Sequence, residues 1–239
     1  MNAFDNTAAR VTSCDWPALH RQLDREGYAL TPTLLDAAQR AELISMYDES
    51  TRFRSRVIMQ RHSFGRGEYQ YFAYPLPPLV QALRMAFYAQ LAPLANAWME
   101  KLGSAIRYPA RLDEFLARCH AQEQKRPTPL LLRYGADDYN CLHQDLYGEQ
   151  QFPLQVIFQL SEPARDFGGG ELVLVEQRPR LQSIPRVVPL AAGSAAIIAV
   201  RERPVAGTRG WHRTQLRHGV SRVTHGQRHT LGIVLHDAA

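Results

Sequence analysis

The stretch LRHGVSRVTHGQRHTLGIVLHDA, residues 216–238, carries the pattern on which both the fold and the chemistry of this chain depend. Two extended runs, one beginning at His218 and the other at Arg228, flank a turn at His225-Gly226, which predicts a β-hairpin. In the second run, strand alternation separates a less bulky face from an aliphatic one. The two faces are Arg228, Thr230, Gly232 and Val234 against Leu231, Ile233 and Leu235. A single arginine leading the less bulky face indicates a cavity that holds an anion.

Similar short extended segments occupy the chain from residue 130 onward. They are rich in branched residues, are separated by Gly and Pro, and recur at the spacing of an antiparallel sandwich or barrel. The segments are LLRY (131–134), LQVIFQL (154–160), ELVLV (171–175), RVVPL (186–190), SAAIIAV (194–200) and TLGIVL (230–235). The second half of the chain is therefore predicted to be a many-stranded β structure.

The first half is predicted to be mainly helical. Apolar residues at spacings of three and four indicate a helix over 16–26, and Gly27 stands where such a helix would stop. Asp36 can cap a second helix that runs to Tyr47, and residues 79–102 form a longer helical region broken or restarted at Pro93. The segment 61–78 alternates glycines, arginines and aromatics without a clear period, and we expect a loop-rich lid there.

Together these patterns predict an α+β protein with a jelly-roll (double-stranded β-helix) core and supporting N-terminal helices. Residues 1–129 would be the helical support region with the lid, and residues 130–239 the catalytic core. At 239 residues and 27.1 kDa, both parts would belong to one structural domain.

Two residues spaced as H-x-D, His143 and Asp145, precede the stretch described above. On an extended backbone this spacing turns both side chains to the same side, as a metal clamp requires. With His218 they form two neutral imidazoles and one carboxylate. Such a set occupies one triangular face of an octahedral Fe(II) and leaves three positions free. Arg228 could then bind the far carboxylate of a dicarboxylic acid through both guanidinium nitrogens.

Charge and composition constrain the partners less tightly. The chain has a formal charge of +5 and a pI near 9.3, which permits an anionic partner such as nucleic acid. Arginines crowd the region from Arg201 to Arg228, with Trp211 among them, although a solvated basic surface explains this equally well. Three widely spaced cysteines and the absence of a secretory signal or long apolar stretch predict a cytoplasmic protein without a membrane anchor.

Residues 130–239 resemble the Fe(II)/2-oxoglutarate dioxygenases, whose pattern is H-x-D, a distal His, and an Arg or Lys about ten residues later. Within that superfamily, RYGADDYNCLHQD (133–145) is similar to the AlkB-type nucleic-acid dealkylases. The whole chain resembles a bacterial family predicted to dealkylate damaged DNA oxidatively. Two departures from the AlkB pattern weaken the nucleic-acid assignment: Leu132 replaces an asparagine, and Val234 replaces a second arginine.

The resemblance implies roles for individual residues. His143, Asp145 and His218 would bind iron, Arg228 would pair with the distal carboxylate of 2-oxoglutarate, and Tyr134 would hydrogen-bond the same carboxylate. Fe(II), 2-oxoglutarate and O₂ would be the cofactor and cosubstrates.

The implied reaction is hydroxylation, or oxidative demethylation of alkylated bases in single-stranded or flipped nucleic acid. The residues expected to contact such a substrate are Tyr69, Tyr71, Arg209, Trp211 and Arg213. Two alternatives stay open: the same chemistry on a protein side chain, as in prolyl hydroxylases, or on a small metabolite. A cupin-like metal-binding module without turnover is the non-enzymatic alternative.

Overall fold

The computed structural model describes residues 3–178, 180–208 and 210–239. Five α-helices and short 3₁₀ turns accompany the strands. The helices are α1 (Ala3–Thr12), α2 (Trp16–Glu26), α3 (Ala37–Ser45), α4 (Pro78–Lys101) and α5 (Leu112–Ala121). The strands of the first half are β1 (Tyr28–Leu30), β2 (Phe53–Ile58), β3 (Gly65–Arg66) and β4 (Glu68–Phe72). Those of the second half are β5 (Leu130–Tyr134), β6 (Tyr139–His143), β7 (Leu154–Gln159), β8 (Phe167–Gly169), β9 (Leu172–Gln177), β10 (Ile184–Val188), β11 (Ala195–Ala199), β12 (Glu202–Gly207), β13 (Gly210–Val220), β14 (Val223–Gly226) and β15 (Arg228–Val234).

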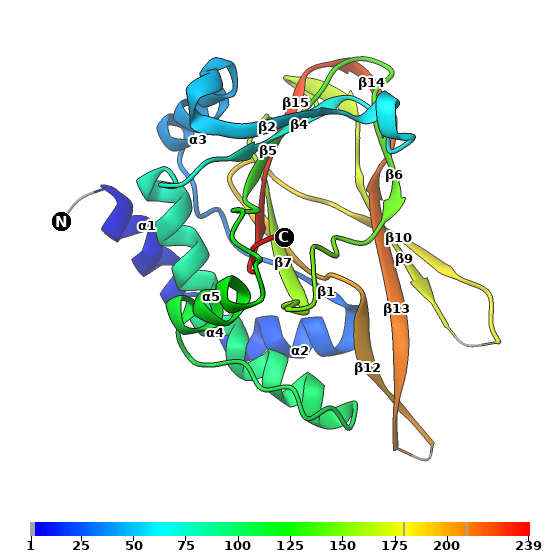
Figure 1. Cartoon of the computed structure of the whole chain (residues 1–239). Helices are drawn as coiled ribbons and strands as arrows, with labels where there is room; N and C mark the ends of the chain where they lie inside the picture. The colour runs from blue at the N-terminus through cyan, green and yellow to red at the C-terminus, as the bar shows by residue number, and fades with distance from the viewer. Residues whose placement is uncertain (1–2, 179, 209) are drawn as a thin grey trace.

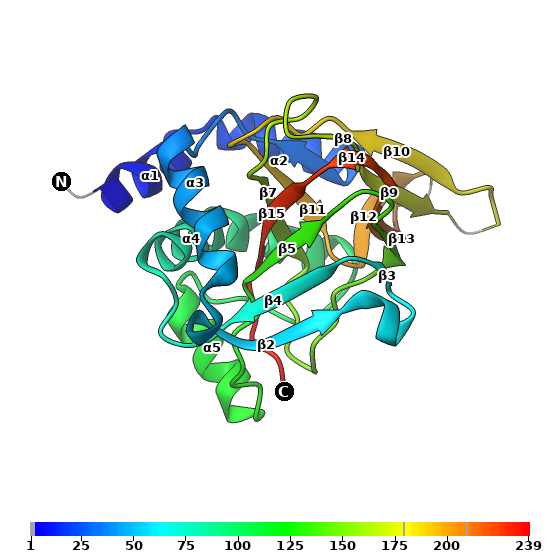
Figure 2. The same cartoon turned by 90° about the horizontal axis from the view of Figure 1, so that it is seen from above.

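Two antiparallel sheets form the centre of the molecule (Figure 1). The seven-stranded sheet has the order β1-β11-β7-β15-β5-β4-β2, and the six-stranded sheet has the order β10-β9-β13-β6-β3 with β12 paired to β13. The strands β8 and β14 form a separate pair. Figure 2, a view from above, shows β15, β5, β4 and β2 of the seven-stranded sheet side by side. Two facing antiparallel sheets with helices in the first half confirm the α+β jelly-roll prediction.

The helices lie on the outer side of the seven-stranded sheet, and α2 and α4 also contact β12 at the edge of the six-stranded one (Figure 1). The aliphatic face predicted for β15, Leu231 and Ile233, packs in the largest core cluster together with Phe87 and Trp98 of α4. The opposite face of β15 looks toward the second sheet. Buried aliphatic area of this kind stabilises the fold by roughly 25 cal/mol per Å².

Several predicted helix boundaries are confirmed. Helix α2 ends at Gly27, which takes a left-handed conformation with φ 78°. Asp36 caps α3 through a reciprocal capping box with Gln39. The break expected at Pro93 is wrong, because α4 continues through this residue. Proline removes only one backbone hydrogen bond, and the side chains on both sides of Pro93 are buried, so packing holds the helix together.

The prediction of a loop-rich lid over 61–78 is wrong in part. Strand β4 lies within this segment and pairs with both β2 and β5 in the seven-stranded sheet. Gln70 conceals the strand pattern, since its buried side chain donates to the Tyr47 carbonyl at 2.7 Å instead of lying in water. Strands β1, β2 and β4 thus join the first half of the chain to the sheet of the second half.

The hairpin predicted at His225-Gly226 is also wrong. His218 lies on β13 in the six-stranded sheet, whereas Arg228 begins β15 in the seven-stranded sheet. The residues between them form β14, which pairs with β8. Gly226 has φ 77°, and a Cβ there would lie 2.0 Å from the Asp166 carbonyl oxygen, so only glycine fits this crossing.

Among the described residues, no helix combines the length and the apolar character that a membrane crossing requires.

Candidate active site

A pocket of about 310 Å³ lies between the two sheets. Strands from both sheets contribute to its wall. Its lining includes Tyr69, Leu132, Tyr134, Asn140, His143, Asp145, Tyr147, Gln155, His218, Arg228, Thr230 and Gly232. The less bulky face predicted for β15 therefore faces a cavity, as alternation along the strand indicated.

Three potential metal ligands meet in this pocket. His143 ends β6 and His218 lies on β13, and the two residues are direct partners across these antiparallel strands. Asp145 follows β6 by two residues, with Oδ2 at 3.3 Å from His218 Nε2 and Oδ1 at 3.6 Å from His143 Nε2. Each residue offers a ligand atom, and all three atoms lie within 4.8 Å of one another. In the described part of the chain, no other group of three His, Cys, Asp or Glu has this geometry.

The protonation of His143 and Asp145 suits a metal. The Cys141 carbonyl lies 2.8 Å from His143 Nδ1; since a carbonyl only accepts, Nδ1 carries the proton and Nε2 presents its lone pair. Burial, with the neighbouring His218, lowers the pKa of His143, which favours the neutral imidazole. Burial alone would raise the pKa of Asp145. Hydrogen bonding to His218, the electrostatic interaction with the two imidazoles and the hydrogen bond from Tyr147 outweigh it, so the pKa of Asp145 lies well below its usual range.

Arg228 is the second notable group in the pocket. It is buried, and its Nε and one terminal nitrogen have no hydrogen-bond partner. No carboxylate of the described residues forms an ion pair with it. Burial lowers the pKa of Arg228 to about 10, but the side chain still carries its charge at neutral pH. An unpaired buried cation is strongly unfavourable, so these orphaned donors fit a carboxylate ligand.

Tyr134 is the direct cross-strand partner of Arg228, on β5. The Arg228 guanidinium carbon lies 5.5 Å from the centre of the Tyr134 ring and 5.9 Å from that of Phe167. The Tyr134 hydroxyl accepts a 3.4 Å hydrogen bond from Asn140 and keeps its own proton free to donate. The donor set of Arg228 and Tyr134 thus matches a dicarboxylic acid that reaches the metal from this side.

The residues predicted to contact substrate lie in different parts of the structure. Tyr69 lines the metal pocket, and Tyr71 lies next to it with its hydroxyl bonded to Tyr147. Arg209 lies outside the described residues. Trp211 lies on β13 seven residues from His218, which at roughly 3.3 Å per residue is about 23 Å away. Its contact is with Lys101, whose ammonium lies 4.5 Å from the indole ring.

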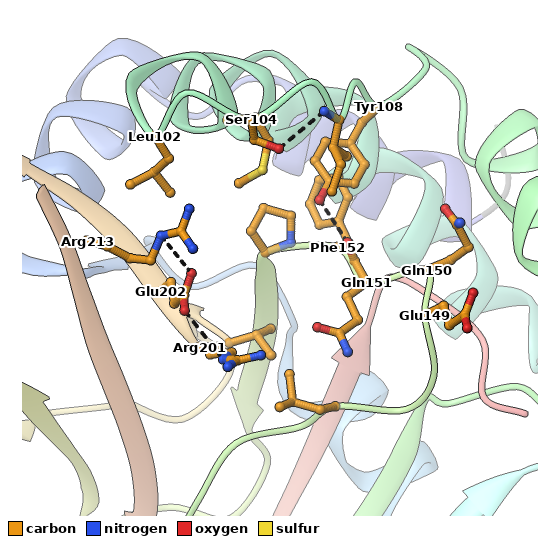
Figure 3. Close-up of a pocket in the computed structure, with 15 residues that line it drawn as sticks. Leu102, Ser104, Tyr108, Glu149, Gln150, Gln151, Phe152, Arg201, Glu202 and Arg213 are labelled. Carbon is orange, nitrogen blue, oxygen red and sulfur yellow. Dashed lines mark hydrogen bonds and ion pairs between the residues drawn. The ribbon is translucent and has the colours of Figure 1, made fainter. Parts of the chain in front are cut away.

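Arg213 lines a different pocket, of about 290 Å³, shown in Figure 3. This second pocket lies beside the segment that follows Asp145, and Leu146 and Glu149 are part of its wall. Arg213 is paired there with Glu202 at 3.2 Å. Trp211 and Arg213 therefore do not line the metal pocket, and their contact with a nucleic acid elsewhere along the molecule stays a prediction.

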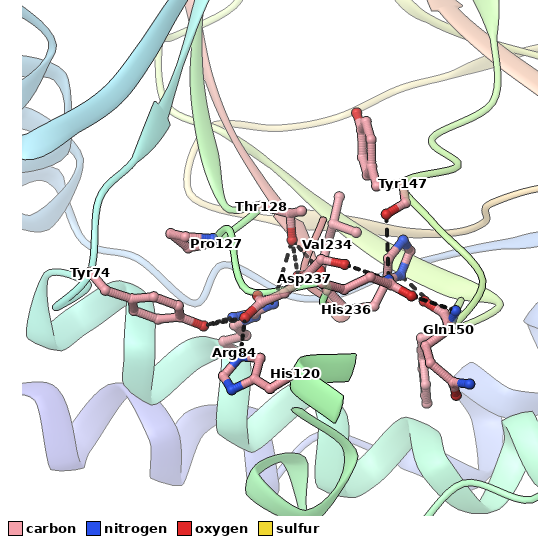
Figure 4. A network of polar contacts seen from close by, with 12 residues as sticks. Tyr74, Arg84, His120, Pro127, Thr128, Tyr147, Gln150, Val234, His236 and Asp237 are labelled. Carbon is pink, nitrogen blue, oxygen red and sulfur yellow. Dashed lines mark hydrogen bonds and ion pairs between the residues drawn. The ribbon is translucent and has the colours of Figure 1, made fainter. Parts of the chain in front are cut away.

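Sequence reasoning missed two groups that support the site. Tyr147 donates to Asp145 Oδ1 at 2.7 Å, and its only signal in the sequence is the two-residue spacing from Asp145. The second group is the buried network around Asp237 near the C-terminus, shown in Figure 4. Asp237 pairs with Arg84 at 2.8 Å and also contacts Tyr74 and His120, each at 2.9 Å.

Comparison with known proteins identifies the family. Residues 67–238, more than half of the chain, match the family Oxygenase-NA, described as oxygenases catalysing oxidative methylation of damaged DNA. Uncharacterised proteins from two strains of Mycobacterium tuberculosis are 47% identical over 168 residues, which covers 70% of this chain and 72% of theirs.

Solved structures share the fold at low sequence identity. A 2OG-Fe(II) oxygenase family oxidoreductase from Burkholderia pseudomallei superposes with a TM-score of 0.54 at 18% identity, covering 94% of this chain and 93% of that one. A prolyl 4-hydroxylase from Phytophthora capsici superposes with a TM-score of 0.53 at 16% identity, covering 97% of this chain and 64% of that one. The chain thus belongs to the Oxygenase-NA family, and its His-Asp-His site fits a non-haem iron dioxygenase that uses Fe(II), 2-oxoglutarate and O₂.

Proposed function

We propose that this protein uses Fe(II), 2-oxoglutarate and O₂ to oxidise alkyl groups on bases of single-stranded or flipped DNA. One observation carries the proposal: a His-Asp-His cluster shares its pocket with a buried arginine that lacks an anionic partner. The first group suits Fe(II), and the second suits the far carboxylate of 2-oxoglutarate.

In this proposal His143, Asp145 and His218 hold the iron, while Arg228 and Tyr134 hold the distal carboxylate. When bound together, Fe(II) and 2-oxoglutarate supply the activation of O₂ that oxidises a C–H bond, and 2-oxoglutarate leaves as succinate and CO₂. The role of the chain itself is to orient the bound groups and to exclude competing water. The hydrogen bond of His143 to the Cys141 carbonyl fixes its tautomer, and residues from both sheets form the walls of the pocket.

The mouth of the pocket supports a base as substrate. Phe64 and Leu142 line the pocket, yet 47% and 43% of their surfaces remain exposed. The turn that carries Phe64 is firmly placed, since the Phe64 carbonyl accepts from the Cys141 amide at 2.9 Å. An exposed aromatic on a fixed backbone offers a stacking surface for a base that has left the duplex. The family description, which concerns damaged DNA, points to the same substrate class.

The proposed reaction on an N-methyl base balances as follows. One O₂ and one 2-oxoglutarate are consumed, one oxygen atom enters the N-methyl group, and the other enters succinate as CO₂ is lost. The resulting N-hydroxymethyl group then breaks its carbon–nitrogen bond. The products on the substrate side are formaldehyde, the unmethylated base and a proton, because the hydroxyl proton leaves as the carbon–nitrogen electrons return to the ring nitrogen.

The test is to supply single-stranded oligonucleotides carrying ring-N-methylated adenine or cytosine, with Fe(II) and 2-oxoglutarate, and to measure succinate and formaldehyde. We expect equal amounts of both products, and none from Asp145→Asn, which keeps the shape of the side chain but loses its charge. Succinate that forms without formaldehyde, or that rises only with proline-containing peptides, would refute the nucleic-acid substrate. No succinate under any condition would refute the enzyme itself and favour a metal-binding module.

A further inference from the structure

Asp145 differs from the two histidines in that no strand holds it. His143 and His218 lie on β6 and β13, whereas residues 144–147 have no regular secondary structure. The direction of the Asp145 carboxylate must therefore come from the contacts of this segment. Two sets of contacts supply it, one to the backbone and one to the carboxylate.

Gln124 holds the backbone that follows Asp145. Its buried amide accepts from the Gln150 backbone N–H at 2.7 Å and donates to the Gln150 carbonyl at 3.0 Å and the Asp237 carbonyl at 2.7 Å. Gly148 lies so close that a Cβ there would come within 2.5 Å of the Gln124 amide carbon. The segment from 145 to 150 is thus tied to the C-terminal network of Figure 4.

Two tyrosine hydroxyls act on the carboxylate itself. The Tyr147 hydroxyl donates to Asp145 Oδ1 at 2.7 Å, and the Tyr71 hydroxyl donates to the Tyr147 oxygen at 2.9 Å. Each hydroxyl has one proton, so the direction of the chain is fixed from Tyr71 to Tyr147 to Asp145. Tyr71 comes from β4 in the opposite sheet, and its burial keeps competing water away.

This arrangement distinguishes the two oxygens of Asp145. Each oxygen lies near one imidazole, Oδ1 at 3.6 Å from His143 Nε2 and Oδ2 at 3.3 Å from His218 Nε2, but only Oδ1 also accepts from the Tyr147 hydroxyl. A carboxylate that bound iron through both oxygens would leave only two of six positions open. A carboxylate that binds through one oxygen leaves three, which is the number that the two cosubstrates need.

We propose that Tyr147, supported by Tyr71, is a positioning residue that keeps Asp145 a one-oxygen ligand of the metal. The inference rests on the iron site of the proposed function. It goes beyond that function because it assigns control over the number of open metal positions to two tyrosines that are not among the proposed metal ligands. Removing the Tyr147 hydroxyl releases Oδ1 to the metal and competes with the chelation of 2-oxoglutarate.

The test compares the parent protein with Tyr147→Phe, Tyr71→Phe and Tyr108→Phe. Tyr108 is a matched control, because its buried hydroxyl donates to the Gln151 carbonyl of the same segment at 2.8 Å but does not contact Asp145. Without O₂, the Fe(II) proteins are titrated with 2-oxoglutarate, and the visible charge-transfer band of the chelate is followed. Metal affinity is measured separately with Co(II) alone, and folding by circular dichroism.

We expect Tyr147→Phe to bind 2-oxoglutarate about 10-fold more weakly while Co(II) affinity stays equal or rises. Tyr71→Phe should show a smaller weakening in the same direction, and Tyr108→Phe none. The inference is overturned if folded Tyr147→Phe keeps the parent affinity for 2-oxoglutarate, or if it loses Co(II) and 2-oxoglutarate together. If Tyr147→Phe does not fold, the inference is overturned by a Tyr71→Phe variant that binds 2-oxoglutarate as tightly as the parent. A parent protein without the chelate band would refute the iron site of the proposed function, which is a separate result.

Discussion

His143 and His218 stand directly opposite each other on neighbouring antiparallel strands, with their ring centres 4.2 Å apart. This pairing places both imidazoles on one face of the six-stranded sheet before any metal is bound. Replacing His218 with Ala should therefore abolish metal binding and lower turnover by more than about 100-fold, since even indirect support of a metal site is worth 10- to 100-fold. Iron stoichiometry and succinate formation measure this. The exposed His225, replaced with Ala, is the control; equal losses in both variants would contradict the assignment.

Arg228 should provide much of the affinity for 2-oxoglutarate and at the same time lower the stability of the ligand-free protein. Arg228→Met removes an unpaired buried charge, so the ligand-free variant should melt at a higher temperature than the parent. The same change should raise KM for 2-oxoglutarate at least about 30-fold, because a buried charge pair contributes roughly 2–5 kcal/mol. Thermal unfolding with and without 2-oxoglutarate checks both effects. A variant that is still stabilised by 2-oxoglutarate as strongly as the parent would show that the carboxylate binds elsewhere.

Phe64 should matter for the oligonucleotide and not for the cosubstrate. Base stacking on an aromatic ring contributes about 1–3 kcal/mol, so Phe64→Ala should raise KM for the methylated oligonucleotide roughly 10-fold. Decarboxylation of 2-oxoglutarate without substrate should not change. Trp211→Ala, which removes an exposed aromatic far along β13, is the comparison. If Trp211→Ala has the larger effect, the base is bound near the β12–β13 end of the sheet and not at the mouth of the pocket.

Stability should fall in mild acid because of buried histidines. Burial, with the charge of Arg133, lowers the pKa of His229 to about 4, and burial lowers that of His236 to about 4 as well. Between pH 6.5 and 4 the unfolded chain binds these protons and the folded chain does not, so the unfolding free energy decreases as the pH drops. His229→Gln should remove up to about 3 kcal/mol of this decrease. Urea unfolding at pH 7 and pH 4.5 measures this decrease, with the exposed His212→Gln as control. The same decrease in unfolding free energy in the parent and in both variants would disprove the role of His229.

The ion pair between Arg84 and Asp237 has both side chains 0% exposed. Asp237→Ala leaves the guanidinium buried without its partner, and we expect a loss of about 3–5 kcal/mol in unfolding free energy. Arg84→Met combined with Asp237→Leu should recover much of this loss, because two apolar side chains need no partner. Chemical unfolding of the single and double variants is the measurement. A double variant no more stable than Asp237→Ala would mean that the contacts of Asp237 with Tyr74 and His120 dominate.

Much of the fold follows from local patterns in the sequence. In β15, for example, side chains that point into the core alternate with side chains that point into the pocket, and this alternation was visible in the sequence. Gly27 ends α2 because glycine takes the left-handed conformation there without strain. The hairpin at Gly226 could not be predicted correctly, since a turn signal does not say which strands its neighbours will pair with. The strand at 68–72 escaped notice because Gln70 is satisfied by a carbonyl distant in sequence.

The candidate site likewise contains residues that the sequence predicted and residues that it did not. Residue types, their spacing and the family resemblance together predicted that His143, Asp145, His218 and Arg228 would converge, and the structure brings the four into one pocket. Trp211 and Arg213 shared only composition with a nucleic-acid surface, and composition gives no position along a strand. Tyr147 and Gln124 act through contacts between segments that are distant in the chain or that lie outside regular structure, so no periodicity points to them.

The two histidines of the proposed metal site and Arg228 belong to different sheets, and we expect this separation to limit which keto acids the protein accepts. One sheet would hold one end of the keto acid and the other sheet would hold its other end. The distance between the sheets would therefore determine which chain length of keto acid can bind. We expect a diacid with one methylene fewer to be too short, and one with a methylene more to fit only when bent. The packing between the two layers should then favour the five-carbon cosubstrate, even through positions that never touch it.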